Sequence, residues 1–200
     1  MNEQPATGSD EEVIADSIGD PSRFALLFDR HYDQVWRYVC RRADATVADE
    51  LASEVFVRAL AGRSALSQGE INVRAWLYGI ATNLLREQSR SEARRWRAYA
   101  RAVGPTATPG GLDEVEGRVD AAARGPAVAR ALAGLQTADR ETLLLLALTE
   151  LDYAGIAIAT GAPIGTVRSR LHRARRQVRL ELGLEPAFID AQSTTKGDGP

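Results

Sequence analysis

The chain has 200 residues, of which 44% are hydrophobic, and its formal net charge is -2. This length allows one large or two small hydrophobic cores, and the nearly balanced charge provides no general affinity for nucleic acid. The single cysteine, Cys40, and two distant histidines exclude an internal disulfide and a zinc-binding spacing, so we expect no metal and no cofactor. The sequence has no apolar run of about 20 residues and no basic signal-peptide start, which favours a cytoplasmic protein with no membrane insertion.

Acidic and basic residues are segregated along the chain. Residues 1–20 carry six acidic residues, no basic residue and no hydrophobic period, so we expect them to form a disordered acidic tail. Arginines cluster instead at residues 86–101 and 168–179. Lys196 is the only lysine among 25 basic residues, and arginine favours bidentate contacts with phosphate and guanine.

The first predicted domain covers residues 21–98 and contains three helices. The apolar spacing predicts them at about 23–42, 46–62 and 73–96, with a loop at 62–73 between the last two. Ser22 is the expected N-cap of the first helix. The expected fold is therefore all-α in this part of the chain.

The second of these helices has two apolar edges. Val47, Leu51 and Val55 lie on one edge, whereas Phe56 and Leu60 lie on roughly the opposite one. Either the helix is buried on both sides, or one edge packs within the domain and the other, flanked by acids, docks a partner helix. The spacing alone leaves these two interpretations open.

The third helix has one buried stripe and an arginine-rich end. Tyr78, Thr82 and Arg86 are expected to face outward. Arginines near a helix C-terminus can simply complement the helix dipole, but their number favours phosphate binding. The buried stripe is expected to contain Trp76, Leu77, Ile80, Ala81 and Leu84.

A linker and a second domain follow. Residues 99–125 are rich in proline, glycine and acids, which predicts a flexible linker. The second domain is expected over residues 126–183, beginning with Pro126 near a helix start, and residues 184–200 are expected to form a disordered tail. Within the domain, a short helix at 153–160, a glycine turn and a longer cationic helix give helix-turn-helix order.

The cationic helix has one apolar and one basic face. Val167, Leu171, Ala174 and Val178 share a stripe, and the stretch between Thr166 and Leu180 contains six arginines and no acid. Such a face requires an anionic partner, and a solvated charged surface is the less favoured alternative. The residues expected to reach DNA lie opposite the stripe: Ser169, His172, Arg173 and Arg176, flanked by Arg168 and Arg175.

The sequence does not indicate an enzyme. It contains no readable arrangement of nucleophile, base and orienting residue, and no phosphate-cradling glycine loop, so we expect no catalytic residues. His31 lies on an apolar stripe and is interpreted as a packing residue, and Trp76 as core.

Taken together, these segments resemble the extracytoplasmic-function (group IV) sigma factors of bacterial RNA polymerase. The resemblance covers residues 22–98 and 126–182. It rests on FDRHYDQVWRYV, ADELASEVFVRAL and VRAWLYGIATNLLRE in the first domain, and on GLQTADRETLLLLALTELDYAGIA and GTVRSRLHRAR in the second. It implies two small helical domains joined by a flexible linker, the C-terminal one a helix-turn-helix.

The resemblance also implies a function. The chain would bind core RNA polymerase, recognise the minus-ten and minus-thirty-five elements of promoter DNA, and initiate transcription; an anti-sigma factor is an expected partner. The loop at 62–73 matches the pocket for a flipped minus-ten base. By the same resemblance, the polymerase-binding residues are Asp49, Glu50, Glu54 and Phe56; the minus-ten residues are Asn83, Arg86, Arg90 and Arg94; and the minus-thirty-five residues include Arg168, Ser169, His172 and Arg173.

Two glycines depart from the family pattern. Gly155 replaces the usual glutamate, which should cost that helix about 1 kcal/mol relative to alanine and loosen docking of the reading helix. Gly79 replaces a larger residue, which should leave the exposed face of the third helix less basic. Two rival functions remain at this point: a helix-turn-helix regulator that binds duplex DNA alone with steep salt dependence, and a helical adaptor that binds only protein.

Overall fold

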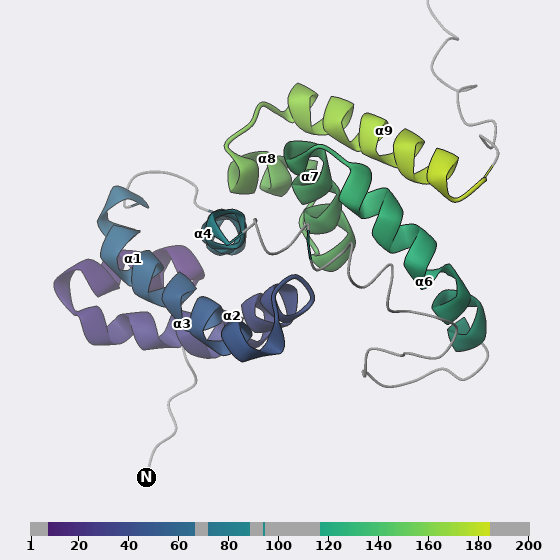
Figure 1. The fold of residues 1–200 in the computed structure, drawn as a ribbon. Helices are drawn as coiled ribbons and strands as arrows, with labels where there is room; N and C mark the ends of the chain where they lie inside the picture. The colour runs from purple at the N-terminus through teal and green to yellow at the C-terminus, as the bar shows by residue number, and fades with distance from the viewer. Residues whose placement is uncertain (1–7, 67–71, 89–93, 95–116, 185–200) are drawn as a thin grey trace, which may run out of the picture.

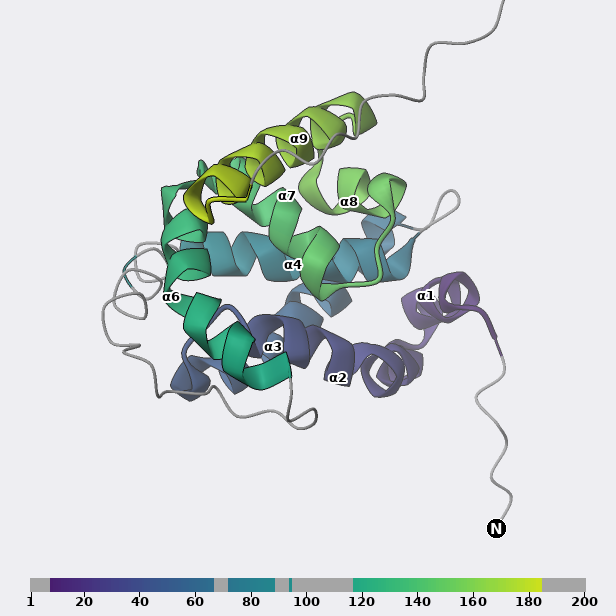
Figure 2. The same ribbon diagram turned by 90° about the vertical axis from the view of Figure 1, so that its right-hand side faces the viewer.

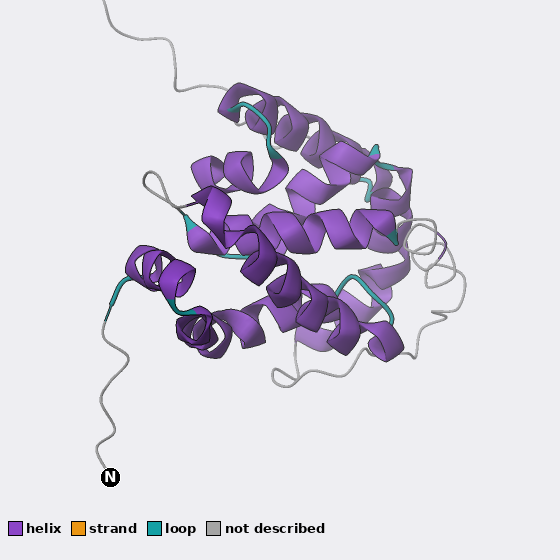
Figure 3. Ribbon diagram, turned by 90° about the vertical axis from the view of Figure 1, so that its left-hand side faces the viewer, coloured by secondary structure: helices purple, strands orange, loops and turns teal. Residues whose placement is uncertain are grey.

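Helices make up the regular structure of the residues that the computed structural model describes, which are 8–66, 72–88, 94 and 117–184 (Figure 1). No strand is found among these residues (Figure 3), so the expected all-α class is confirmed. The first domain contains α1 (Asp10–Gly19), η1 (Pro21–Phe24), α2 (Ala25–Cys40), α3 (Ala45–Gly62), η2 (Arg63–Leu66) and α4 (Val73–Glu87). The second contains α6 (Gly117–Gly134), α7 (Thr137–Leu148), α8 (Tyr153–Thr160) and α9 (Ile164–Glu181).

The N-terminal helix α1 was not expected. Ser9 and Glu12 cap it reciprocally, each side chain accepting a hydrogen bond from the other residue's backbone N–H. Val13 and Ile14 are buried against the first domain. The expectation of a disordered tail is therefore wrong for residues 10–19, because a capping box and an apolar pair stabilise a helix there; residues 1–7 lie outside the described residues.

Asp10 joins α1 to α2. Its Oδ1 lies 2.9 Å from Nη1 of Arg30 and its Oδ2 lies 2.6 Å from Nε2 of His31. His31 is buried, so its interpretation as a packing residue is confirmed, with the addition of a carboxylate partner. This pair of contacts fixes the first turn of α1 onto the domain.

Replacement of Asp10 with asparagine is expected to lower the free energy of unfolding by about 1 to 3 kcal/mol, because both contacts lose their charge assistance in a partly buried site. Asp16→Asn is the control: its carboxylate pairs with Arg23 at 3.5 Å, with both side chains exposed, and such pairs contribute about 0.5 kcal/mol. Urea unfolding measures both. Equal, small effects would show that Asp10 does not hold α1.

Several expected helix boundaries differ from the structure. Pro126 lies inside α6 rather than near its start, since α6 begins at Gly117 within the expected linker. The helix expected from residue 46 begins at Ala45, and its N-cap is Asp44, without a side-chain hydrogen bond. The short helix expected at 153–160 is confirmed. The end of the third helix expected near 96 lies mostly outside the described residues.

The helices form layers with α4 in the middle. Figure 2 shows α9 on the outside, α7 and α8 beneath it, α4 across the centre, and α2 and α3 on the far side, and Figure 1 looks along α4 between the same layers. One cluster of buried apolar residues runs through both domains, and a second, smaller one lies within the second domain among α6, α7 and α9. Tyr38 and Tyr78, from α2 and α4, meet edge to face in the larger cluster, with ring centroids 5.2 Å apart. The two domains are therefore packed against each other through α4.

This packing covers a face of α4 that the sequence analysis expected to be exposed. Tyr78 and Thr82 are buried, and Tyr38 shares a hydrogen bond of 3.0 Å with the hydroxyl of Thr82. Burial raises the pKa of both tyrosines. The prediction was wrong because the residues that cover this face, on α7 and α8, are distant in sequence.

Candidate nucleic-acid interface

A tight turn joins α8 to α9. Asp152 caps α8 by accepting a 2.7 Å hydrogen bond from the N–H of Gly155. Gly161 ends α8 with a φ of 62°, a left-handed conformation that glycine adopts without strain. Pro163 then precedes the first turn of α9. The three residues 161–163 thus turn the chain from a short helix into a long one, in helix-turn-helix order.

The reading helix α9 has the two faces expected from its sequence. Val167, Leu171 and Ala174 are buried, and Val178 is half-buried. This apolar stripe holds α9 on the outside of the molecule, against α6, α7 and α8 (Figure 2). All six residues expected to contact the minus-thirty-five element are exposed on the remaining surface: Arg168, Ser169, His172, Arg173, Arg175 and Arg176.

Two arginines of this set also have partners in the second domain. Nε and Nη2 of Arg173 donate to the two carboxylate oxygens of Asp139 on α7, at 3.0 and 2.8 Å. These hydrogen bonds raise the pKa of Arg173 above its ordinary value. Nη1 of Arg175 lies 3.4 Å from the hydroxyl of Tyr153. Arg173 therefore helps to fix α9 on α7, which the sequence analysis did not anticipate.

The expected minus-ten residues lie at the end of α4 or beyond it. Asn83 and Arg86 are exposed and contact each other at 3.2 Å. Nε and Nη2 of Arg86 also donate to the carboxylate of Glu141 on α7, at 3.0 and 2.6 Å, which raises the pKa of Arg86. Arg94 is exposed, and Arg90 lies outside the described residues.

Acidic side chains form a surface on α3. Asp49 and Glu50 are exposed and Glu54 is partly exposed, whereas Phe56 is buried. Glu50 and Glu54 line a groove of about 560 Å³ together with Arg58, Glu87 and Arg94, among others. The lining combines three glutamates with two arginines, and Arg58 donates hydrogen bonds to Glu54 and Glu87 within it.

Comparison with known proteins assigns the two domains. The model for Sigma-70 region 2 matches residues 27–95, and the model for Sigma-70, region 4 matches residues 126–178. Over 175 residues the chain is 33% identical to the ECF RNA polymerase sigma factor SigC of Mycobacterium tuberculosis (strain CDC 1551 / Oshkosh), covering 85% of this chain and 91% of SigC. The chain belongs to the extracytoplasmic-function sigma factor family. This sigma factor is also 32% identical over 171 residues to SigL of Mycobacterium tuberculosis (strain ATCC 25618 / H37Rv), covering 85% of this chain and 94% of SigL.

Two solved structures share the fold. One is CnrH in complex with the cytosolic domain of CnrY, with a TM-score of 0.60 and 22% identity, covering 88% of this sigma factor and 98% of that chain. The other is the sigma factor RpoE in complex with the anti-sigma factor NepR from Bartonella quintana, with a TM-score of 0.55 and 21% identity, covering 81% and 98%.

The structure corrects the expected polymerase-binding set of this sigma factor at one position. The ring of Phe56 lies 5.0 Å from that of Phe28 and 5.9 Å from that of Tyr32, measured between centroids, so α2 covers it. The α3 edge that contains Phe56 is therefore filled by the chain itself. The acidic residues beside that edge, rather than its aromatic ring, are available to a partner.

Sequence reasoning missed the two carboxylates that hold the arginines. Asp139 and Glu141 are buried in α7, and each binds an arginine from another helix. Their position in the sequence was a usable signal, because both acids stand directly before an apolar run that must be buried. Burial of an unpaired carboxylate there would cost too much free energy, so each acid should have a cationic partner. Across the described residues, no cluster of three metal-ligating side chains is found, and no helix is long and apolar enough to cross a bilayer.

Proposed function

We propose that this sigma factor directs bacterial RNA polymerase to specific promoters by reading the minus-thirty-five element with α9 and the separated minus-ten strand with α4. The first domain binds core polymerase, and the complete holoenzyme initiates transcription in the cytoplasm. No chemical step is assigned to the chain, which supplies specificity rather than catalysis.

The observation that supports this proposal most strongly is the exposed cationic face of α9. It belongs to the second helix of a helix-turn-helix, the element that such domains insert into the major groove. Arg168, His172 and Arg176 are exposed on it, and none of them forms an ion pair with a carboxylate of the described residues. Arginine there can fork onto guanine or bind phosphate.

The proposed minus-ten surface combines charge with an amide. Asn83 and Arg86 lie together on α4, and Arg90 and Arg94 continue the basic sequence toward the linker. Backbone phosphates of a single strand are bound by such cations, with bases held by stacking or in pockets. The loop at 62–73, part of which lies outside the described residues, is proposed to hold one flipped base.

Core polymerase is proposed to bind the acidic surface of α3 through Asp49, Glu50 and Glu54. Asp49 accepts a hydrogen bond from the indole N–H of Trp36, which fixes its carboxylate at the surface. An anti-sigma factor is a second proposed partner, because the RpoE structure that shares this fold is a complex with one. Such a partner would compete for the same surfaces.

One experiment tests the whole proposal. Purified protein is added to core RNA polymerase, and transcripts from fragmented genomic DNA are mapped to their start sites. A shared pair of upstream elements at the starts that require the protein is the expected result. If no start depends on added protein, the proposed function is wrong.

Replacement of Glu50 with lysine is expected to weaken binding to core polymerase by about tenfold, because it reverses a charge in the centre of the acidic surface. Glu11→Lys is the matched control: it makes the same charge change at an exposed position on α1. Binding is measured by interferometry at two salt concentrations, and the difference should shrink at high salt. An equal loss in both variants would assign the effect to total charge instead.

A further inference from the structure

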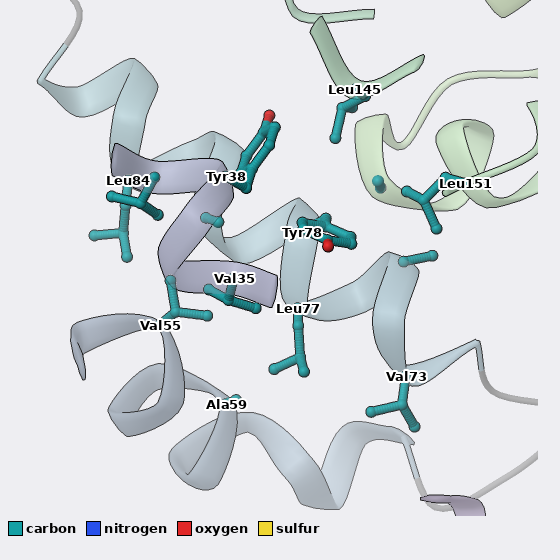
Figure 4. Packing of buried hydrophobic residues seen from close by; sticks show 14 of the residues in the cluster. Val35, Tyr38, Val55, Ala59, Val73, Leu77, Tyr78, Leu84, Leu145 and Leu151 are labelled. Carbon is teal, nitrogen blue, oxygen red and sulfur yellow. The ribbon is translucent and has the colours of Figure 1, made fainter. Parts of the chain in front are cut away.

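The first turn of α9 presents an apolar side chain to the solvent. Ile164, the first residue of this helix, is 42% exposed. Many large apolar side chains are packed instead: Figure 4 shows Val35, Leu77 and Leu151 among them, in the buried cluster that runs through both domains. Ile164 lies four residues before Arg168, so the two side chains are neighbours on one face of the helix. It therefore belongs to the surface that carries the proposed contacts with the minus-thirty-five element.

The position of Ile164 in the helix-turn-helix places it near base edges. Residues at the start of the second helix of this motif contact the edges of base pairs in the major groove. Pro163 is the N-cap of α9, so Ile164 follows the turn directly. Because isoleucine is branched at Cβ, its χ1 angle has one strongly preferred value in a helix. The side chain thus loses little conformational freedom when a base covers it.

The chemistry of an isoleucine side chain restricts the base that it can recognise. It has no hydrogen-bond donor or acceptor, whereas the major-groove edges of guanine, adenine and cytosine present polar groups. Thymine differs because its C5 methyl group is an apolar feature on this edge. Burial of a methyl group against an apolar side chain is favourable, but covering a polar group without a hydrogen bond is costly. Thymine is therefore the base that suits Ile164.

The glycine that follows Ile164 has no evident role within the chain. Gly79 shows the contrast: a Cβ there would lie 2.9 Å from the carbonyl oxygen of Ala159 in α8, so the expectation that Gly79 lies on an exposed face is wrong. Gly165 is exposed, and a Cβ there would meet nothing within 4 Å. Glycine nevertheless weakens a helix relative to alanine. A close approach by another molecule would account for glycine at this position.

We propose that Ile164 packs against the C5 methyl group of one thymine in the minus-thirty-five element, and that Gly165 lets α9 approach the DNA closely enough for this contact. The inference rests on the proposed function and adds a specificity-determining residue to it. Arg168, one turn later, binds a neighbouring base pair or phosphate. The element that this sigma factor reads therefore contains a thymine at a fixed position.

Deoxyuridine tests the contact directly, because it pairs as thymidine does and lacks only the methyl group. A cognate promoter is taken from start-site mapping, and each thymidine of its minus-thirty-five element is replaced in turn. Binding of the holoenzyme to these fragments is measured at one fixed salt concentration. The affinity of the starting holoenzyme should fall about fourfold at one position, as expected for loss of one buried methyl group.

Variants of Ile164 assign that loss to one side chain. Ile164→Ala should weaken binding to the unmodified promoter by about fourfold or more, and deoxyuridine at the sensitive position should then have no further effect. Ile164→Val keeps a branched apolar surface and should retain the sensitivity. Ile158→Ala is the matched control, because it truncates another exposed isoleucine, on α8. Equal sensitivity in Ile164→Ala and the starting protein would overturn the proposal, as would an element without a sensitive thymine.

Gly165→Ala tests the close approach. Promoter binding should weaken by about tenfold, the size of one lost DNA contact. The urea midpoint should stay equal or rise, because the new Cβ meets nothing in the chain. Gly19→Ala is the control: its Cβ also meets nothing within 4 Å, and its position on α1 should leave promoter binding unchanged. Unchanged promoter binding by Gly165→Ala would show that DNA does not approach this turn closely.

Failure of this inference and failure of the proposed function give different results. If the starting holoenzyme transcribes from no promoter, the proposed function is wrong. If it transcribes, but no effect of deoxyuridine depends on residue 164, only the contact with thymine is wrong.

Discussion

Replacement of Arg168, His172 and Arg176 with alanine together is expected to reduce transcription from a cognate promoter at least about 100-fold, while binding to core polymerase is unchanged. Each side chain is exposed on α9, and loss of one base or phosphate contact typically costs about 1 to 3 kcal/mol. These positions are neighbours four residues apart on one helix face, so the three losses need not add fully, but a 100-fold effect requires only about 2.8 kcal/mol in total. Multi-round transcription and polymerase pull-down measure the two quantities.

The control for this variant removes two arginines elsewhere. Arg41 and Arg130 are exposed and lie outside α4 and α9. The double variant Arg41→Ala with Arg130→Ala therefore removes two guanidinium charges, as many as the α9 variant does. Transcription should stay within about twofold of the starting protein, because only weak, long-range attraction to DNA is lost. A comparable loss in both variants would show that α9 contributes charge without recognition.

Arg173 is left intact in this design for a structural reason. It binds the buried carboxylate of Asp139 through two hydrogen bonds. Its removal would leave a buried carboxylate without its partner, which is destabilising. A defect in Arg173→Ala would therefore combine loss of DNA contact with loosening of α9, and could not be assigned to either.

The second domain was predictable where its structure is local. The spacing of Val167, Leu171 and Ala174 determines which face of α9 is buried, and Gly161 marks the turn before it. Both signals lie within a few residues of the feature they predict. Gly155, expected to weaken α8 and loosen docking of the reading helix, is buried, and a Cβ there would lie 3.0 Å from Cδ2 of Leu151, so a larger residue would require Leu151 to move.

Features created by distant contacts were not predictable from the same patterns. Tyr78 and Thr82 were expected to face outward because the apolar stripe of α4 is on its other side, yet the second domain buries them. Nothing in the periodicity of α4 indicates which helix will cover it. The position of Glu141 before an apolar run indicates that it needs a partner, but nothing local identifies that partner as Arg86, 55 residues away.

Replacement of Leu145 with alanine is expected to lower the free energy of unfolding by about 2 to 5 kcal/mol, because Leu145 is fully buried in the apolar cluster that both domains share. Leu180→Ala is the control: that side chain is 70% exposed and its loss should change stability by less than about 0.5 kcal/mol. Urea unfolding followed by circular dichroism measures both variants.

Tryptophan fluorescence shows whether this loss crosses between the domains. The chain has three tryptophans, and Trp36 and Trp76 lie in the first domain whereas Leu145 lies in the second; Trp96 precedes the linker. Because Tyr38 and Tyr78 pack in the same cluster as Leu145, the fluorescence transition should move to lower urea together with the dichroism transition. If fluorescence stays unchanged while dichroism shifts, the domains unfold independently, and the shared core does not couple them.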